Sequence, residues 1–141
     1  MKRVIPYLIS LGLFAGIAYY NIDVAKVSGD SMSPLISSGQ TIWGIKTDRF
    51  NKNNIVIADI DVNGKVVTMV KRVYGVKGDH IRIEGNSVFV NGELIKILTS
   101  NQKDAEFVLG DNEYFLLGDN PNTVWVRCEG RSIKSRMEFI K

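Results

Sequence analysis

The sequence predicts a mainly β protein, in which one N-terminal apolar helix precedes a compact, mostly antiparallel β domain. Two observations predict this fold class. Residues 4–20 contain no charged side chain, whereas from Ile22 onward apolar residues recur with a period close to two, between turn residues. No long amphipathic helical pattern follows residue 21. The chain therefore divides into an N-terminal segment, residues 1–21, and a β domain, residues 22–141.

The N-terminal segment has the pattern of a membrane anchor. Lys2 and Arg3 precede the apolar stretch 4–20, which as a helix reaches about 26 Å, at the short end of what spans a bilayer. The basic residues favour a cytoplasmic N-terminus, so the β domain is expected on the outer side of a membrane. Two alternatives stay open: a cleavable export signal, because residues 16–18 have a small-x-small pattern, and a buried core helix.

Many short strands are predicted in the rest of the chain, which is typical of antiparallel β folds. Asn63-Gly64 between two apolar runs predicts a tight hairpin, and similar pairs at 85–86 and 91–92 punctuate a small meander. The predicted strands are residues 22–28, 40–46, 54–61, 65–76, 80–84, 87–90, 93–95, 106–109, 113–118 and 136–140.

Composition argues against several kinds of site. A net charge of +3 and 45% hydrophobic residues suit one packed domain of 141 residues. Cys128 and His80 are the single cysteine and histidine, so neither a metal site nor an intrachain disulfide is expected. Cys128 is expected to be partly buried and His80 to lie at the surface. Basic residues mix with acidic ones, so no nucleic-acid partner is expected, and no cofactor is predicted.

The first segment with chemical character is Ser-Gly-Asp-Ser-Met-Ser-Pro, residues 28–34, after a predicted strand. Gly29 allows a tight turn, and Pro34 stiffens the chain just past Ser31. A serine at such a turn presents its hydroxyl outward, while nearby backbone N–H groups face a developing oxyanion. By itself, such a segment is more often only a turn.

The second segment places a lysine among apolar neighbours. In a strand, Val67, Met69 and Val73 lie on one face. Lys71 lies on the same face, whereas Arg72 points the other way, where it is expected to stay solvated. Burial lowers the pKa of an amine, which is what a lysine general base requires. The alternative is a lysine whose amine reaches solvent at a sheet edge.

The third segment, residues 116–123, ends a predicted strand in the polar sequence Gly-Asp-Asn-Pro-Asn-Thr, which alone reads as a loop. Together, the three segments resemble the motifs of the bacterial type I signal peptidases, which use a serine/lysine dyad. The residues that carry the resemblance are Ser31, Met32 and Pro34, then Lys71, Arg72, Gly78 and Asp79, and then Gly118, Asp119 and Asn120.

The resemblance implies a serine endopeptidase with a single membrane pass in the bacterial cytoplasmic (inner) membrane and its catalytic domain on the outer face. Its partners would be the lipid bilayer and, as substrates, the signal peptides of exported preproteins, which it would remove after small residues. Ser31 would be the nucleophile and Lys71 the general base, and the backbone N–H of Ser31 would help form the oxyanion hole. Supporting positions would be Gly29, Thr123, Asp119, Asn120 and Arg127. Candidate substrate-binding residues, from strand parity and the resemblance, are Ile22, Val24, Val27, Met32 and Met69.

The third segment departs from the family pattern. Thr123 stands at a serine position, where its hydroxyl is still able to orient Lys71. Trp125 stands at an aspartate position, and an indole is no substitute for a carboxylate that pairs with arginine. These departures suggest a specialised member, such as a plasmid- or phage-borne or conjugative-transfer peptidase. Two other hypotheses stay open: a self-cleaving repressor-type Ser/Lys protease, and a catalytically impaired relative that binds signal peptides or partner proteins.

Overall fold

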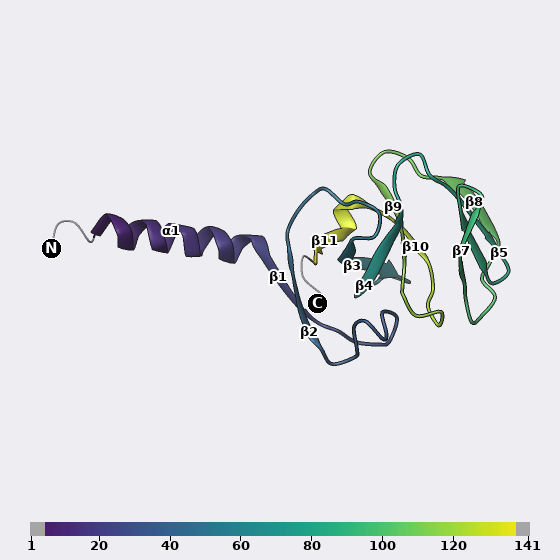
Figure 1. Ribbon diagram of the computed structural model, residues 1–141, viewed down its shortest axis with the longest axis horizontal. Coiled ribbons are helices and arrows are strands. Elements are labelled where there is room, and N and C mark those ends of the chain that lie inside the picture. The colour runs from purple at the N-terminus through teal and green to yellow at the C-terminus, as the bar shows by residue number, and fades with distance from the viewer. Residues whose placement is uncertain (1–4, 138–141) are drawn as a thin grey trace.

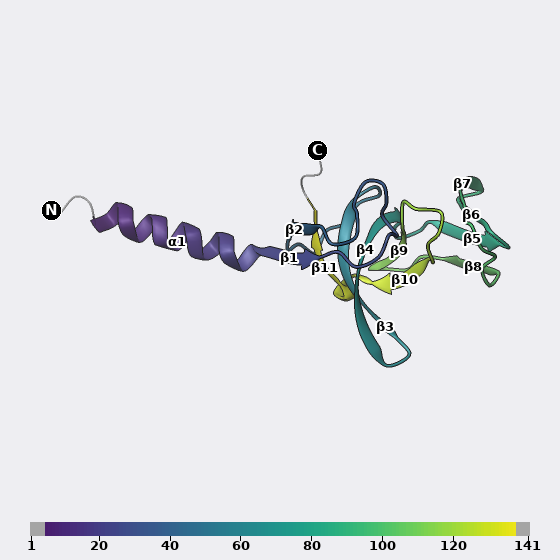
Figure 2. The same ribbon diagram turned by 90° about the horizontal axis from the view of Figure 1, so that it is seen from below.

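The computed structural model describes residues 5–137, in which one α-helix precedes two β-sheets. Helix α1 (Ile5–Asn21) runs directly into strand β1 (Ile22–Lys26) and projects away from the β body (Figures 1 and 2). Among residues 8–17, whose side chains the structure describes, the large apolar ones are exposed: Leu11 at 66% and Phe14 at 73%, for example. Within residues 5–137, no helix has the combined length and apolar character needed to cross a membrane.

The larger sheet has seven strands and the smaller sheet has four, and neighbouring strands in both run antiparallel. The larger sheet has the order β1, β2 (Thr41–Ile45), β11 (Ile133–Arg136), β3 (Ile55–Val62), β4 (Lys65–Gly75), β9 (Glu113–Leu117) and β10 (Val126–Glu129). The smaller sheet has the order β7 (Glu93–Ile97), β6 (Ser87–Val90), β5 (His80–Glu84) and β8 (Ala105–Val108).

The predicted mainly antiparallel β fold is confirmed, with corrections near the C-terminus. Asn63 and Gly64 form the β3–β4 turn with φ angles of 55° and 80°, as an Asn-Gly hairpin requires. Strand β10 was not predicted, because its four residues include Arg, Cys and Glu, and only pairing with β9 makes them a strand. The last strand was predicted at 136–140, but β11 occupies Ile133–Arg136 after the 3₁₀ turn Gly130–Ser132; residues 138–141 lie outside the described residues.

The first half of β3, residues 55–58, is buried on both faces and separates two apolar clusters of the larger sheet. Ile55 and Ile57 join a cluster with Val27 and Met32, whereas the alternate residues of β3 face a second cluster, around Val73. Val27 is 7% exposed and Met32 is 1% exposed. These two side chains therefore fix the segment around Ser31 to the core, and neither is among the residues that line the cleft described below.

Strands β4 and β9 join the two sheets. The pairing of β4 with β9 shifts register between Val73 and Gly75, which is where β4 reaches the smaller sheet. A Cβ at Gly75 would lie 2.9 Å from the side chains of Ile81 and Leu109, so a glycine is needed for this close packing. Phe115 and Leu117 of β9 complete the core of the smaller sheet. This core fixes the smaller sheet against the strand that carries Lys71.

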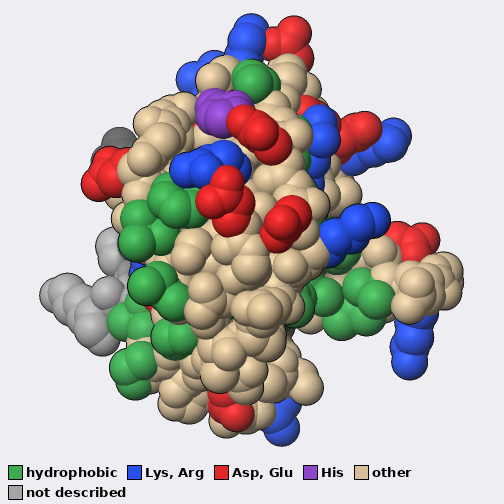
Figure 3. All heavy atoms as spheres, turned by 90° about the vertical axis from the view of Figure 1, so that its right-hand side faces the viewer, with side chains coloured by type: hydrophobic (Ala, Val, Ile, Leu, Met, Phe, Trp, Pro, Cys, Tyr) green, Lys and Arg blue, Asp and Glu red, His purple; other side chains and the backbone are tan. Residues whose placement is uncertain are grey.

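The outer end of the molecule, formed by the smaller sheet, carries intermingled acidic and basic side chains (Figure 3). An ion pair on this sheet joins Arg82 to Glu84. The Nε2 atom of His80 lies 2.8 Å from a carboxylate oxygen of Glu106, and these side chains are 40% and 61% exposed, respectively. His80 thus has the surface location expected from the sequence.

Candidate active site

A cleft of about 410 Å³ lies where three segments, distant in sequence, come together. One segment is the turn at residues 28–31, another is the part of β4 at residues 67–71, and the third is the loop at residues 122–124; Ser100 from a further loop completes the lining. The pairing of β4 with β3 extends from Lys65 to Arg72, whereas its pairing with β9 begins only at Arg72. The cleft therefore runs along the stretch of β4 that precedes its pairing with β9.

Ser31 lies in this cleft, at the turn that leaves β1. Gly29 supplies a φ of 94° at this turn, a conformation that favours glycine. The Ser31 hydroxyl donates to the carbonyl oxygen of Val70, at 3.3 Å, which places the hydroxyl beside the residue before Lys71. The next residue, Met32, is buried in the core and so anchors the chain directly after Ser31. A rigid turn thus presents one serine to the edge of β4.

Lys71 is the buried cation of the cleft, with only 3% of its surface exposed. Its Nζ donates to Thr123 Oγ1 at 2.6 Å and to the Val124 carbonyl oxygen at 3.4 Å. Burial, followed by the positive charge of Lys96, lowers the pKa of Lys71 from 10.5 to about 8. A substantial share of this amine is neutral near pH 8, which is the protonation state that a general base requires.

The loop from Gly118 to Thr123, here called the late loop, contacts both of these residues. The backbone N–H of Asn120 donates to the carbonyl oxygen of Ser31 at 2.9 Å. Gly118 lies so close to Ser31 that a Cβ there would overlap the Ser31 carbonyl and would come within 2.6 Å of Thr123 Oγ1. Glycine is therefore required for the close approach of the two backbones. The same loop holds the backbone of Ser31 and the amine of Lys71.

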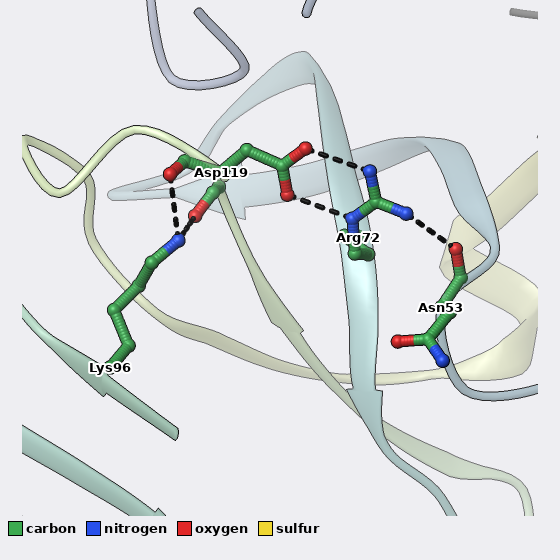
Figure 4. A network of polar contacts seen from close by, with 5 residues as sticks. Asn53, Arg72, Lys96 and Asp119 are labelled. Carbon is green, nitrogen blue, oxygen red and sulfur yellow. Dashed lines mark hydrogen bonds and ion pairs between the residues drawn. The ribbon is translucent and has the colours of Figure 1, made fainter. Parts of the chain in front are cut away.

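Arg72 does not stay in solvent, contrary to the expectation from strand alternation. Its guanidinium forms two parallel hydrogen bonds with the carboxylate of Asp119, both at 2.8 Å, and a third with the Asn53 carbonyl at 2.8 Å (Figure 4). A bidentate pair of this kind is geometrically specific. Asp119 in the late loop supplies the carboxylate that pairs with this arginine of β4.

Other predicted residues do not reach the cleft. Arg127 on β10 forms an ion pair with Glu113, at 2.9 Å, and its guanidinium lies over the ring of Phe107. Trp125 packs against the rings of Phe107 and Phe115, with centroids 5.9 and 6.0 Å apart. The contacts of Arg127 and Trp125 thus hold β9, β10 and the smaller sheet together.

The five candidate substrate-binding residues are divided by the structure. Met69 lines the cleft, together with Val67 of the same strand. Ile22 and Val24 are 41% and 63% exposed on β1 and are not among the residues that line it, and Val27 and Met32 are in the core, as described above. An alternating strand pattern shows which residues share a face, but it does not show which face borders a cavity.

Several cleft residues have no recognisable signal in the sequence. Ser100, Asn122 and Val124 line the cleft from loops, and only the fold brings them there. Lys96 on β7 donates to the carbonyl oxygens of Gly118 and Asp119 at 2.7 and 2.8 Å. In an alternating strand, a lysine such as Lys96 is normally taken as solvated, so sequence reasoning missed it.

The chain matches the family model described as signal peptidase, peptidase S26, over residues 1–124. The chain belongs to this family of signal peptidases. The resemblance inferred from the three sequence segments is thereby confirmed. The part of the chain that matches the signal peptidase family model includes Ser31, Lys71 and the late loop, and it ends at residue 124.

Signal peptidases from several bacteria are similar to the chain. Signal peptidase I of Bacillus licheniformis is 32% identical over 112 residues, 67% of this chain and 59% of that protein. Signal peptidase I P of Bacillus subtilis subsp. natto is 30% identical over 134 residues, 81% of this chain and 70% of that protein. Signal peptidase IB of Staphylococcus aureus (strain COL) is 28% identical over 100 residues, 65% of this chain and 51% of that protein. The chain thus spans only 59% of the length of the Bacillus licheniformis relative.

Proposed function

We propose that this protein is a membrane-anchored serine endopeptidase that removes signal peptides from exported preproteins after small residues. The observation that carries the proposal is the buried amine of Lys71, which shares one cleft with Ser31 and is held by Thr123. A buried lysine with a lowered pKa, beside a serine on a rigid turn, is the arrangement of a nucleophile and its base. Membership of the signal peptidase family supports the substrate class.

The chemistry needs only residues of the chain. Ser31 Oγ attacks the carbonyl carbon of the scissile peptide bond and transfers its proton to the neutral amine of Lys71. Lys71 then gives this proton to the leaving amine, and water later releases the acyl group from Ser31. The backbone N–H of Ser31 stabilises the oxyanion. The Ser31 hydroxyl, which donates to Val70 in the free protein, turns towards Lys71 when substrate fills the cleft.

Substrate is proposed to bind as an extended segment along β4. Residues 67–71 form one side of the cleft, and Val67 and Met69 offer apolar contacts there. The backbone of β4 is available for pairing in this stretch, because β9 pairs only from Arg72 onward. This proposal keeps Met69 as a substrate-binding residue and adds Val67.

Helix α1 is proposed to anchor the protein in the cytoplasmic membrane, with the β domain on the outer face. The large apolar side chains at residues 8–17 of α1 are exposed, for example Leu13 at 67% and Ile17 at 56%, and a lipid environment would cover them. Lys2 and Arg3 precede the helix and favour a cytoplasmic N-terminus. Because β1 begins at the residue after α1, Ser31 would lie close to the bilayer surface.

The test is cleavage of a peptide with Ala at the −1 and −3 positions, in the presence of a metal chelator, with mass analysis of the products. We expect cleavage by the wild type to rise with pH through about 8, because Lys71 loses its proton there. Ser31→Ala, Lys71→Met and Lys71→Arg should each lose roughly 10³-fold or more in kcat. Lys71→Arg is included because a guanidinium stays protonated.

Two control variants match these substitutions. Ser37→Ala changes an exposed serine that follows the same turn, and Lys65→Met changes an exposed lysine on the same strand. Both should cleave at the wild-type rate. Equal activity of the wild type, Ser31→Ala and Lys71→Met would refute the dyad. No cleavage by the wild type or by any variant would favour a relative that binds signal peptides without cutting them.

A further inference from the structure

Lys96 lies outside the cleft but makes contact with the loop that organises it. It belongs to β7, the edge strand of the smaller sheet, and is half-buried. Its Nζ donates to two consecutive carbonyl oxygens, those of Gly118 at 2.7 Å and Asp119 at 2.8 Å (Figure 4). The ammonium also lies 5.5 Å from the centroid of the Tyr74 ring. These contacts fix the end of a long side chain that would otherwise be mobile.

The late loop, which Lys96 holds, is hydrogen-bonded to both proposed catalytic residues. One residue beyond the two carbonyls, the N–H of Asn120 donates to the Ser31 carbonyl. At the other end of the loop, Thr123 accepts the hydrogen bond from the Lys71 amine. A further bond ties the same loop to the segment after β7, because the Thr99 N–H donates to the Pro121 carbonyl at 3.0 Å. The smaller sheet thus holds this loop at two points.

We propose that Lys96 is a positioning residue for the peptidase reaction: it holds the late loop from the smaller sheet and thereby fixes Ser31 and Lys71 relative to each other. The inference rests on the proposed function of this site. Lys96 does not line the cleft and is not expected to touch substrate. Its effect should therefore appear in kcat, while KM stays close to the wild-type value.

The charge of Lys96 acts on the same centre. The positive charge of Lys96 contributes to the low pKa of Lys71, after burial. Around Lys96 itself, burial lowers its pKa, the carboxylate of Asp119 raises it, and the guanidinium of Arg72 lowers it. The Lys71 amine faces Thr123 and the Val124 carbonyl as its hydrogen-bond acceptors. Removal of the Lys96 charge should therefore make Lys71 easier to protonate and move its titration to higher pH.

The experiment compares Lys96→Met and Lys96→Arg in the full-length protein with a matched control, Lys77→Met. Lys77 forms an exposed ion pair with Asp111, so its substitution removes the same charge far from any contact with the late loop. For Lys96→Met we expect kcat to fall about tenfold or more, KM to change by less than about twofold, and the acidic limb of the pH profile to move to higher pH. Lys96→Arg keeps the charge, so its acidic limb should stay with that of the wild type.

A second readout does not depend on peptidase activity. The titration of the Lys71 amine, followed by NMR with labelled lysine in detergent micelles, should move to higher pH in Lys96→Met and stay in place in Lys77→Met. If the wild type cleaves no peptide, the proposed function fails, and this titration still decides the role of Lys96. A Lys71 titration in Lys96→Met that coincides with the Lys77→Met control would overturn the inference, as would equal kcat values in these two variants.

Discussion

At the scale of single residues, the burial of Lys71 favours the proposed chemistry but lowers the stability of the folded protein. A base must be neutral near working pH, and burial of the amine at 3% exposure achieves this. The same burial disfavours the charged form that the unfolded chain carries. Between a pKa of about 8 in the folded protein and 10.5 for a free lysine, the difference corresponds to roughly 3 kcal/mol. The proposed active site thus lowers the stability of the fold.

Replacing this amine should therefore stabilise the protein while it abolishes the proposed activity. We expect the free energy of unfolding of Lys71→Met at pH 7, measured by urea denaturation, to exceed that of the wild type by roughly 1–3 kcal/mol. The folded state binds fewer protons than the unfolded state between about pH 8 and 10.5, so wild-type stability rises with pH there. The advantage of Lys71→Met should be complete below about pH 8 and shrink above it. A gain of equal size in Lys65→Met, or one independent of pH, would contradict this account.

At the scale of elements, the late loop is the connection that the site depends on. It follows β9 and meets the turn after β1 and the side chains of β4. Asp119 binds Arg72 from one side, and Lys96 binds the backbone from the other (Figure 4). Between these contacts, Gly118 allows the loop backbone to approach that of Ser31. The loop is thus held by both sheets, which explains how a short polar segment keeps a defined conformation.

A side chain at position 118 should separate the two segments. In Gly118→Ala, the new Cβ would overlap the Ser31 carbonyl and lie 2.6 Å from Thr123 Oγ1, where the backbone has little room to yield. We expect peptide cleavage to fall about 10²-fold and the free energy of unfolding to fall by about 1–3 kcal/mol. Gly110→Ala is the matched control, since its Cβ would meet only the end of the Glu113 side chain at 3.2 Å. Wild-type cleavage by Gly118→Ala would show that the close approach is not needed.

At the scale of the whole molecule, the helix and the β body form one continuous structure without a linker. Strand β1 begins at the residue after α1, and the N–H of Lys46, the residue after β2, donates to the Asn21 carbonyl at 2.8 Å and so holds the junction. Figure 1 shows α1 extending from the body at this point. If α1 lies in a membrane, the position of the cleft relative to the bilayer is set by this junction and not by a flexible tether.

The membrane proposal predicts that a flexible linker at this junction should slow the cleavage of membrane-bound substrates only. Insertion of about six Gly and Ser residues between Asn21 and Ile22 adds a flexible link of roughly 13 Å. In proteoliposomes, we expect cleavage of a membrane-inserted preprotein to fall several-fold, because the effective concentration of the cleft at the bilayer surface falls. Cleavage of a soluble peptide by the same variant serves as the control and should not change. An equal loss for both substrates would indicate damage to the β domain instead.

The strands were largely predictable, because alternation of apolar residues and Asn-Gly turns are local signals. The Asn63-Gly64 hairpin shows this, since both residues adopt the positive φ angles that their side chains favour. Strand β10 was missed, because its four residues gain their partner from β9 and carry little pattern of their own. The burial of Val27 and Met32 in the core was also not predicted, because alternation shows which residues share a face but not what covers that face.

The sequence by itself identified Ser31 and Lys71 as the proposed dyad, because three segments resemble the motifs of the signal peptidases in their residue types and order, and that comparison needs no coordinates. It also determined the β class of the fold and the apolar N-terminal segment. Only the tertiary structure decided that Asp119 pairs with Arg72, that Arg127 serves β9, and that Lys96 holds the late loop. A lysine or arginine in a strand has the same local pattern whether its long side chain ends in solvent or on a distant loop, and only packing selects between the two.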